Sequence, residues 1–296
     1  MKLVVLLILL IILLIFLRQK TETFSNKNKN MAVLIHTFDG YNRYWKPLLY
    51  FTNKYLNIDY DIYIGVENMD IPPEILGKVK ILKSGKGTFI DRLESHLNKL
   101  DKMGYKYVYL MQEDHWYTKP TSFGVKHNEI FKNSLKLMER DNIECLKLHV
   151  LSMHPFDTNL VEKYHHKLLN NHLYYLNTHF RNMKNLGISH NGCIVTMKLM
   201  KHSCKATKLK GYSTAKGHEY ATVSDEFGEI KRNSYGNGWL ILQADKKKTI
   251  LDFIHVGIRG KLNKLGENAL KNEGKEEWIK IINSKKNQIR QRQESK

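Results

Sequence analysis

The feature that most constrains the fold is a helical segment that runs directly into a buried strand. Residues 89–103 place apolar side chains at helical spacing, and residues 105–112 form an apolar, aromatic run typical of a β-strand. The next two residues are Glu113 and Asp114. Ligands of open α/β sheets bind just beyond the carboxyl ends of the strands, so both acids stand where a ligand is expected.

Two adjacent carboxylates at the end of an apolar strand repel one another unless a cation lies near them. Carboxylate oxygens are ligands of divalent cations, and such a cation can bind a diphosphate and stabilise it as a leaving group. We therefore expect Asp114, assisted by Glu113, to hold Mn²⁺ or Mg²⁺. The alternative is a solvated turn that carries two acids and binds nothing.

Strand-like runs alternate with helical segments through the first half of the chain. Expected strands cover residues 31–36, 60–66, 79–82 and 105–112, and expected helices cover 45–55, 89–103 and 125–140. This alternation predicts a mainly parallel sheet. Shorter expected strands at 145–150, 173–176, 193–197, 239–242 and 250–256 predict added antiparallel or mixed structure. The expected fold class is α/β, a mixed sheet flanked by helices.

Charge and cysteine content exclude several classes of protein. The formal charge is +19, but lysine is spread along the chain, and no zinc finger, RNP-like motif or basic heptad segment occurs. We expect no dedicated nucleic-acid function, although anionic partners such as nucleotide diphosphates or acidic membranes remain compatible with this charge. The three cysteines lack CxxC spacing, which argues against structural zinc. A single disulfide bond between Cys193 and Cys204 remains as an alternative to three free thiols.

The N-terminus differs from the rest of the chain. Residues 3–17 are an unbroken apolar run, preceded by Lys2 and followed by Arg18 and Lys20. As a helix they would span ~22 Å, which snorkelling of the flanking basic side chains extends. We expect an uncleaved transmembrane anchor over residues 1–20, a polar stem over 21–30, and a cleaved signal peptide as the alternative. The membrane orientation is left open. The basic residues after the apolar run favour a cytoplasmic globular domain, whereas the short N-terminal tail favours a lumenal one.

Several segments together resemble a known group of enzymes. The opening strand followed by Asp39-Gly40-Tyr41 and Trp45 resembles the start of a group of bacterial and viral glycosyltransferases. Residues 91–114, which end in Gln112-Glu113-Asp114, resemble their helix, strand and Gln-(Glu/Asp)-Asp element. Residues 255–261 are similar to a C-terminal strand that ends in a basic Gly-Lys turn. The resemblance covers residues 31–265 in patches.

This resemblance implies a GT-A fold, which is a Rossmann-like domain that binds a nucleotide-sugar, usually with a divalent metal. The resemblance places the catalytic domain at residues 31–266 and leaves residues 267–296 as a charged C-terminal helix or tail. It also implies that His255 completes the metal shell, a buried histidine without a metal being the alternative. The common metal motif of this fold is Asp-x-Asp, so the Gln112-Glu113-Asp114 sequence departs from it and puts metal dependence in question.

Further residues are candidates for binding the donor. They are two acids near strand ends, an acid and an arginine at the start of the expected helix 89–103 (the arginine being otherwise a surface charge), and two basic residues of a Gly-punctuated turn: Asp39, Glu113, Asp91, Arg92, Arg259 and Lys261. Each has a structural interpretation as well. Asp39 precedes Gly40 in a turn, Asp91 is an acid at a helix N-terminus, and Arg259 and Lys261 are surface charges.

Transfer with inversion needs a base that deprotonates the acceptor hydroxyl. Glu219, within Gly217-His218-Glu219-Tyr220, is the candidate, with Asp225 and Glu226 as substitutes. No GxSxG, HExxH, Walker A or GxGxxG motif occurs. The expected function is transfer of a sugar from a nucleotide-diphosphate donor to a hydroxyl acceptor on a glycan, lipid or protein. The alternatives are a membrane-tethered, non-catalytic binding protein of the same fold and a basic protein that coats nucleic acid or an anionic membrane.

Overall fold

The computed structural model describes residues 30–122, 124–140, 142–148, 165–168, 173–178, 192–223, 237–243, 251, 253–258 and 261–284. The expected membrane anchor and nearly all of the expected stem lie outside the described residues. Among the residues that are described, no helix combines the length and the apolar content needed to cross a membrane.

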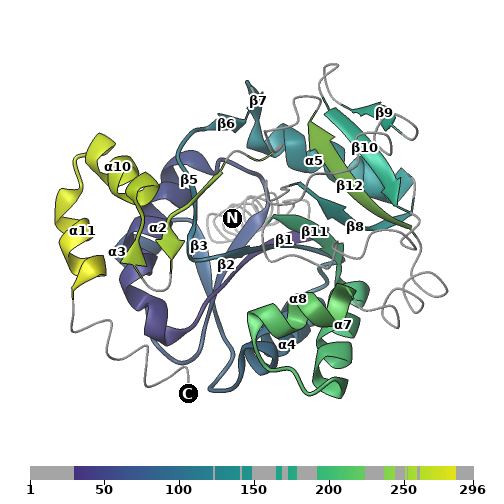
Figure 1. Ribbon diagram of the computed structural model, residues 1–296, viewed down its shortest axis with the longest axis horizontal. Helices are drawn as coiled ribbons and strands as arrows, with labels where there is room; N and C mark the ends of the chain where they lie inside the picture. Colours follow the sequence, from purple (N-terminus) through teal and green to yellow (C-terminus); the bar gives the residue numbers. More distant parts are fainter. Residues whose placement is uncertain are drawn as a thin grey trace, which may run out of the picture.

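A nine-stranded sheet of order β3-β2-β1-β4-β11-β8-β12-β10-β9 forms the centre of the fold (Figure 1). Its first four strands are parallel: β1 (Met31–His36), β2 (Asp61–Val66), β3 (Val79–Lys83) and β4 (Tyr107–Gln112). Helices α2 (Asn42–Tyr55), α3 (Pro73–Leu76) and α4 (Phe89–Lys102) lie between them in the chain. The predicted parallel first half is confirmed.

The second half of the sheet is mixed, as predicted. Strand β11 (Cys193–Thr196) is antiparallel to β4 and to β8 (Ile143–Lys147). Strand β12 (Asn237–Gln243) is parallel to β8, whereas β10 (Leu173–Thr178) and β9 (His165–Leu168) continue the sheet in antiparallel pairing. The helices of this half are α5 (His127–Arg140), α7 (Met197–Leu209) and α8 (Ala215–Val223).

Alternation along β1 divides its buried side chains between two apolar layers. Met31, Val33 and Ile35 pack in the layer that contains buried residues of α2 and α5. Ala32 and Leu34 pack in the layer that contains buried residues of α4 and α7. Because both faces of the first strands are covered, their sequences read as continuous apolar runs.

Three short strand pairs lie outside the main sheet. Strand β5 (His115–Tyr117) pairs with β13 (Phe253–His255), β14 (Gly257–Ile258) pairs with β15 (Lys261–Leu262), and β6 (Thr121–Ser122) pairs with β7 (Val125–Lys126). The last pair corrects the helix predicted over residues 125–140. That helix begins at His127, because the two preceding residues take part in the strand pair.

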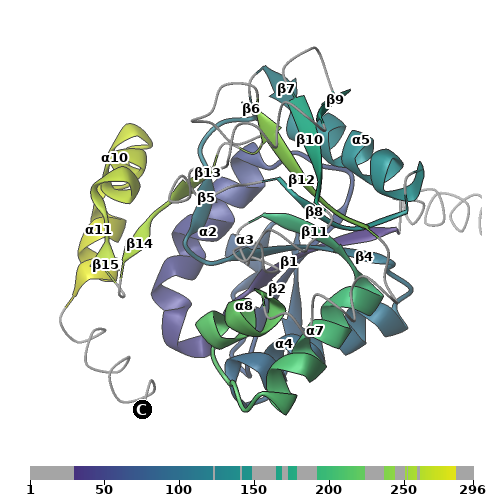
Figure 2. The ribbon, with the colours of Figure 1, turned by 45° about the vertical axis from the view of Figure 1, so that its right-hand side comes forward.

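The chain ends, among the described residues, in two helices, α10 (Lys264–Asn272) and α11 (Glu276–Asn283). They lie beside α2, and Leu270, Trp278 and Ile282 belong to the same apolar layer as α2 (Figure 2). The expected boundary between residues 266 and 267 therefore falls inside α10. All three cysteines are buried and free, so no Cys193–Cys204 bridge is formed.

Candidate active site

The order of the parallel strands defines the place of the site. From β1 the chain proceeds outward to β2 and β3, and then returns to form β4 on the other side of β1. Ligands of open α/β sheets bind at such a switch point, outside the carboxyl ends of the strands. The residues that leave β1 and β4 there are Thr37 and Glu113, each directly followed along the chain by residues predicted to contact a ligand.

Asp114 lies at the centre of a small group of metal-ligating side chains. Among the described residues, the ligand atoms of Asp114, His115 and His255 all lie within 4.8 Å of one another. The pairing of β5 with β13 causes this, since His115 and His255 are opposite one another in the register. Their rings meet edge to face with centroids 4.3 Å apart. Metal-ligand candidates Asp114 and His255, predicted from the sequence, are thus brought together.

The two histidines of this group have different capacities to bind a metal. The backbone N–H of Gln112 donates to His115 Nδ1 at 3.3 Å. A neutral imidazole whose Nδ1 accepts a hydrogen bond carries its proton on Nε2. His115 Nε2 lies 3.5 Å from Asp114 Oδ1, but the two atoms do not form a hydrogen bond. Burial lowers the pKa of His255, which keeps that imidazole neutral and able to act as a ligand.

The position of Asp114 is fixed by backbone contacts with the segment after β13. The N–H of Val256 donates to the Asp114 carbonyl oxygen at 2.9 Å. The absence of a side chain at Gly257 leaves room for the Asp114 side chain, because a Cβ at position 257 would lie 3.1 Å from Asp114 Cβ. The Asn263 side-chain amide donates to the His255 carbonyl oxygen at 2.6 Å and its Oδ1 accepts from Gly266 N at the start of α10. Helix α10 thereby holds β13, the strand that carries His255, beside Asp114.

Burial raises the pKa of both acids of the site. For Asp114 burial is the dominant cause, and Oδ1 accepts no hydrogen bond among the described residues. Burial also raises the pKa of Glu113, the charge of Asp114 adds to this, and a hydrogen bond with Thr37 acts in the opposite direction. Thr37 Oγ1 in turn accepts from Trp45 Nε1 at 3.2 Å. Glu113 therefore has a contact at the end of β1 and is not part of the group around Asp114.

Two tyrosines that follow β1 lie close to this pair of acids. Burial raises the pKa of Tyr44 to about 12, and its hydroxyl lies 3.8 Å from the position of a Cβ on Gly257. Burial and then the charge of Glu113 raise the pKa of Tyr41. Both phenols stay neutral at ordinary pH. The site therefore has hydroxyl groups beside its acids.

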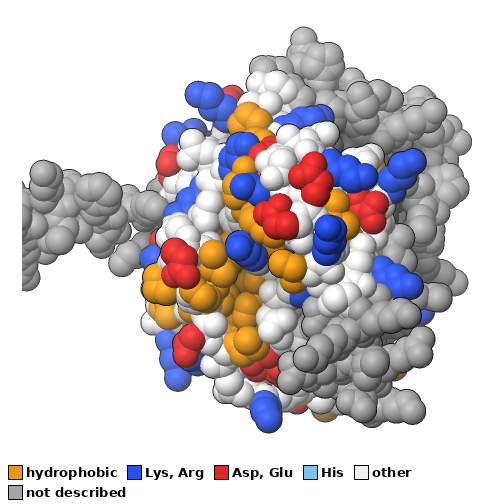
Figure 3. All heavy atoms as spheres, turned by 90° about the vertical axis from the view of Figure 1, so that its left-hand side faces the viewer, with side chains coloured by type: hydrophobic (Ala, Val, Ile, Leu, Met, Phe, Trp, Pro, Cys, Tyr) orange, Lys and Arg blue, Asp and Glu red, His pale blue; other side chains and the backbone are white. Residues whose placement is uncertain are grey.

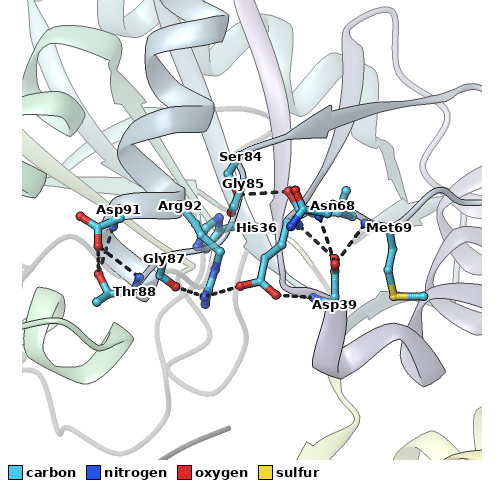
Figure 4. Close-up of polar contacts among 12 residues, drawn as sticks. His36, Asp39, Asn68, Met69, Ser84, Gly85, Gly87, Thr88, Asp91 and Arg92 are labelled. Atoms are coloured by element: carbon cyan, nitrogen blue, oxygen red, sulfur yellow. Dashed lines mark hydrogen bonds and ion pairs between the residues drawn. The ribbon is translucent and has the colours of Figure 1, made fainter.

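Asp39 joins the segments that follow β1 and β2. Its carboxylate accepts backbone N–H groups of Glu67, Asn68 and Met69, each at 3.0 Å (Figure 4). Three convergent N–H donors form an anion-binding nest, and here a side chain of the protein itself fills it. Asp39 therefore links the loop after β1 to the loop after β2, beside the switch point of the sheet.

Arg92 and Asp91, at the start of α4, also have protein partners. Arg92 Nη1 lies 3.1 Å from Glu67 Oε1 and its guanidinium lies 5.0 Å from the centroid of the Phe38 ring. Asp91 forms a capping box with Thr88 (Figure 4) and an ion pair of 2.8 Å with Lys208. The hydrogen bond from Lys208, followed by that from Thr88, lowers the pKa of Asp91 to about 2.

The remaining predicted residues are not brought into the described site. Lys261 is exposed on β15, whose partner strand β14 begins at Gly257 beside Asp114. Glu219 belongs to α8, but its side chain is not among those described. Arg259, Asp225 and Glu226 lie outside the described residues.

Sequence reasoning missed Gly257 and Asn263, and it weighed His115 as a further metal ligand but favoured a lone packing or surface residue. The run of three bulky side chains at His115, Trp116 and Tyr117 was a signal for a short strand directly after the acids. Asn263 stands before a helical pattern, where asparagine is a common N-cap. No local pattern indicates that Gly257 faces Asp114.

No family model and no curated protein matches this sequence. A solved structure from Desulfovibrio desulfuricans G20, described as a nucleotide-diphospho-sugar transferase, is 13% identical with a TM-score of 0.29, over 40% of this chain and 57% of that one. S. aureus TarS 1-349 is 12% identical with a TM-score of 0.38, over 74% and 59%. A further S. aureus TarS structure is 13% identical with a TM-score of 0.34, over 59% and 29%. The chain spans less than two thirds of each of these proteins, and similarity at this level carries no part of the argument below.

Proposed function

We propose that this protein is a metal-assisted glycosyltransferase of GT-A-like fold. It moves a sugar from a nucleotide-diphosphate donor to a hydroxyl acceptor. The observation that carries the proposal is the place of Asp114, a partly buried acid two residues beyond the carboxyl end of β4, at the switch point of the sheet. Its Oδ1 accepts no hydrogen bond among the described residues, and the ligand atoms of Asp114 and His255 lie within 4.8 Å of each other.

The chemistry of these residues fits a divalent cation. Asp114 would supply a carboxylate oxygen and His255 a neutral imidazole nitrogen, and His115 lies beside both. An imidazole among the ligands favours Mn²⁺ over Mg²⁺, because Mg²⁺ prefers oxygen ligands only. When bound, the cation supplies positive charge that stabilises the leaving nucleoside diphosphate.

The residues around the cation site bind and orient the two substrates. We assign Glu113, which contacts Thr37, to a hydroxyl of the donor ribose, and Arg92 to a phosphate of the donor. Asp39 maintains the loops that border the donor. In the transfer, the bond between the sugar C1 and the diphosphate oxygen breaks, and the acceptor oxygen bonds to C1. A carboxylate takes the acceptor proton, and Glu219 or Asp225 is our candidate.

A second candidate function is donor binding without transfer. The observation that favours it is that Glu113 contacts Thr37, so only one of the two adjacent acids belongs to the group around His255. A site with one carboxylate holds a cation less firmly than a site with two. A protein of this kind would bind a nucleotide-sugar and release no product.

The test is the release of nucleoside diphosphate from UDP-, GDP- and CMP-linked sugars by the full chain, with and without Mn²⁺. For CMP-sugars the measured product is CMP. We expect release from one nucleotide class that depends on Mn²⁺, is abolished in Asp114→Asn and is retained in the surface control Asp101→Asn. Release that Asp114→Asn leaves unchanged would refute the assignment. Metal-dependent binding without release or transfer to any acceptor would favour the second candidate.

A further inference from the structure

Tyr44, in the first turn of α2, has a buried hydroxyl group beside the candidate cation site. The side chain is 1% exposed and packs in the apolar layer that contains buried residues of α2 and α5. No acceptor for its hydroxyl hydrogen occurs among the described residues. A buried donor without an acceptor destabilises a folded chain, and a phenylalanine ring would fill the same space. Packing alone therefore does not account for the hydroxyl.

The charged neighbours of Tyr44 leave its hydroxyl as a hydrogen-bond donor. Burial raises the pKa of Tyr44 to about 12, and the guanidinium of Arg43 acts in the opposite direction. The phenol therefore keeps its proton at neutral pH. Arginine carries N–H donors and no acceptor, so Arg43 can approach the phenol oxygen but cannot accept the hydroxyl hydrogen. What the hydroxyl lacks, within the described part of the chain, is an acceptor.

Gly257 leaves a space that Tyr44 and Asp114 both border. A Cβ at position 257 would lie 3.8 Å from the Tyr44 hydroxyl oxygen, 3.7 Å from Asp114 Oδ2 and 3.1 Å from Asp114 Cβ. The Asp114 side chain is 27% exposed, and Gly257 is partly exposed as well. The space is therefore close to the surface. A ligand held by a cation at Asp114 and His255 comes within reach of the Tyr44 hydroxyl.

The chemistry of the hydroxyl selects among the groups that could accept its hydrogen there. Asp114 itself does not accept it in this structure. A water molecule bound to a cation directs a lone pair to the metal and its hydrogens outward, so it is a poor acceptor. A phosphate oxygen of a nucleotide-sugar is anionic and forms short, strong bonds with O–H donors. The hydroxyl therefore matches the diphosphate of the donor better than the hydration shell of the cation.

We propose that Tyr44 is a donor-binding residue whose hydroxyl donates a hydrogen bond to a phosphate oxygen of the nucleotide-sugar, in the space beside Gly257. This inference rests on the proposed function, because the phosphate belongs to the donor that the cation at Asp114 holds. Tyr44 adds an uncharged contact with the diphosphate beside the cation. The hydroxyl destabilises the empty site and is satisfied when phosphate binds, so its removal should change stability and affinity in opposite directions.

The matched pair of variants is Tyr44→Phe and Tyr60→Phe. Each substitution removes one oxygen from a ring in the same apolar layer, and burial raises the pKa of Tyr60 to about 12 as well. Tyr60 directly precedes β2, at the edge of the sheet opposite the carboxyl ends of the strands. In the full chain, isothermal titration measures the binding of Mn²⁺ alone and of inorganic pyrophosphate at saturating Mn²⁺. Calorimetry gives the unfolding temperature without ligands.

Surface lysines are a competing place for pyrophosphate, because the formal charge of the chain is +19. Figure 3 shows one face of the molecule, where lysine and arginine side chains are interspersed with acidic and apolar ones. Binding to such dispersed charges does not require Mn²⁺ and is weakened by salt. The titrations are therefore made at about 0.15 M salt, and a titration without Mn²⁺ is subtracted.

We expect Tyr44→Phe to weaken pyrophosphate binding about tenfold, the effect of losing one hydrogen bond to a charged acceptor, and to leave Mn²⁺ affinity unchanged. Its unfolding temperature without ligands should equal or exceed that of wild type. Tyr60→Phe should bind Mn²⁺ and pyrophosphate as wild type does.

Four results would overturn the proposal. The first two are unchanged pyrophosphate affinity in Tyr44→Phe and an absence of Mn²⁺-dependent pyrophosphate binding in wild type. The third is an equal loss of Mn²⁺ affinity in Tyr44→Phe, which would assign the hydroxyl to the cation. The fourth is a lower unfolding temperature of Tyr44→Phe, which would show that the hydroxyl has an acceptor in the folded chain without ligand.

The failure of this inference and the failure of the proposed function give different results. Pyrophosphate binding that Tyr44→Phe weakens, in a protein that binds no UDP-, GDP- or CMP-sugar, refutes the proposed function and keeps the contact between Tyr44 and phosphate. Mn²⁺-dependent binding of a nucleotide-sugar that is equal in wild type and Tyr44→Phe refutes this inference alone.

Discussion

At the scale of single residues, Asp114 combines a cost to stability with its proposed role. A partly buried carboxylate with one oxygen that accepts no hydrogen bond among the described residues destabilises the folded chain unless a cation compensates it. We expect Asp114→Asn to raise the stability of the metal-free protein at neutral pH by about 1–2 kcal/mol. The same variant should lose the rise in unfolding temperature that Mn²⁺ gives the wild type. Calorimetry with and without Mn²⁺ checks both, and a destabilised variant that still responds to Mn²⁺ would contradict the account.

A second residue-scale prediction concerns His96, which is fully buried against Gly65. Its Nδ1 lies 3.2 Å from His36 Nδ1, and burial lowers its pKa to about 4. Below about pH 6.5 the unfolded chain takes up a proton that the folded chain does not, so stability falls as the pH decreases from 6.5 toward 4.

The measurement for His96 is the free energy of unfolding at pH 7.5 and pH 5. We expect wild type to lose about 1–3 kcal/mol over this interval beyond the loss shown by His96→Gln. The variant will be less stable overall because the packing against Gly65 changes, so the slope with pH is the readout. Parallel slopes for both proteins would show that His96 does not titrate as described.

At the scale of elements, helix α10 is linked to the site through its N-cap. Asn263 caps the helix and also donates to the His255 carbonyl oxygen. We expect Asn263→Ala to cost about 1 kcal/mol of stability and to weaken Mn²⁺ binding about tenfold, because His255 loses its support. Thr196→Ala removes the N-cap of α7, away from the site, and is the matched control. Equal Mn²⁺ affinity in both variants would show that the N-cap of α10 does not support the metal site.

Helix α10 is also joined to α2 by a carboxylate. Burial raises the pKa of Glu273, but hydrogen bonds from Lys54, Tyr55 and Tyr50 together outweigh it and lower the pKa to about 2. Because the folded pKa lies below the unfolded value, this contribution is present above about pH 4.5 and is lost as the pH falls toward 2. Lys54 is 45% exposed, so solvent screening limits the effect to about 1 kcal/mol. Unfolding of Glu273→Gln should show a weaker acid dependence than wild type between pH 5 and pH 2.5.

The sequence predicted the elements whose signals are local. Strands β1 and β4 are apolar runs up to their last residue and α4 has helical periodicity, so both types of element were recognisable. The pairing of β5 with β13 was not, because each strand has three residues and the two are far apart in the chain. The pairing alone brings His255 opposite His115 and beside Asp114. The Asp39 contacts were equally hidden, since the Asp-Gly pair indicates a turn but not the N–H groups that the carboxylate accepts.

At the scale of the whole molecule, one sheet joins the two halves that the sequence distinguished. Strand β11 continues the parallel half through antiparallel pairing with β4, so β4, which Glu113 directly follows, lies inside the sheet. The alternation of strands and helices in the first half, and the change to mixed pairing in the second half, were predictable from segment length and composition. The order of the strands did not, because it depends on packing between distant segments.

The proposed function requires metal-dependent binding of a nucleotide-sugar at Asp114. The most direct measurement is isothermal titration of the full chain with UDP-, GDP- and CMP-sugars, with and without Mn²⁺, for wild type, Asp114→Asn and Asp101→Asn. We predict micromolar binding of one nucleotide class that requires Mn²⁺, persists in Asp101→Asn and is lost in Asp114→Asn. Binding that is the same in all three proteins, or absent in a folded wild type, would contradict the central claim.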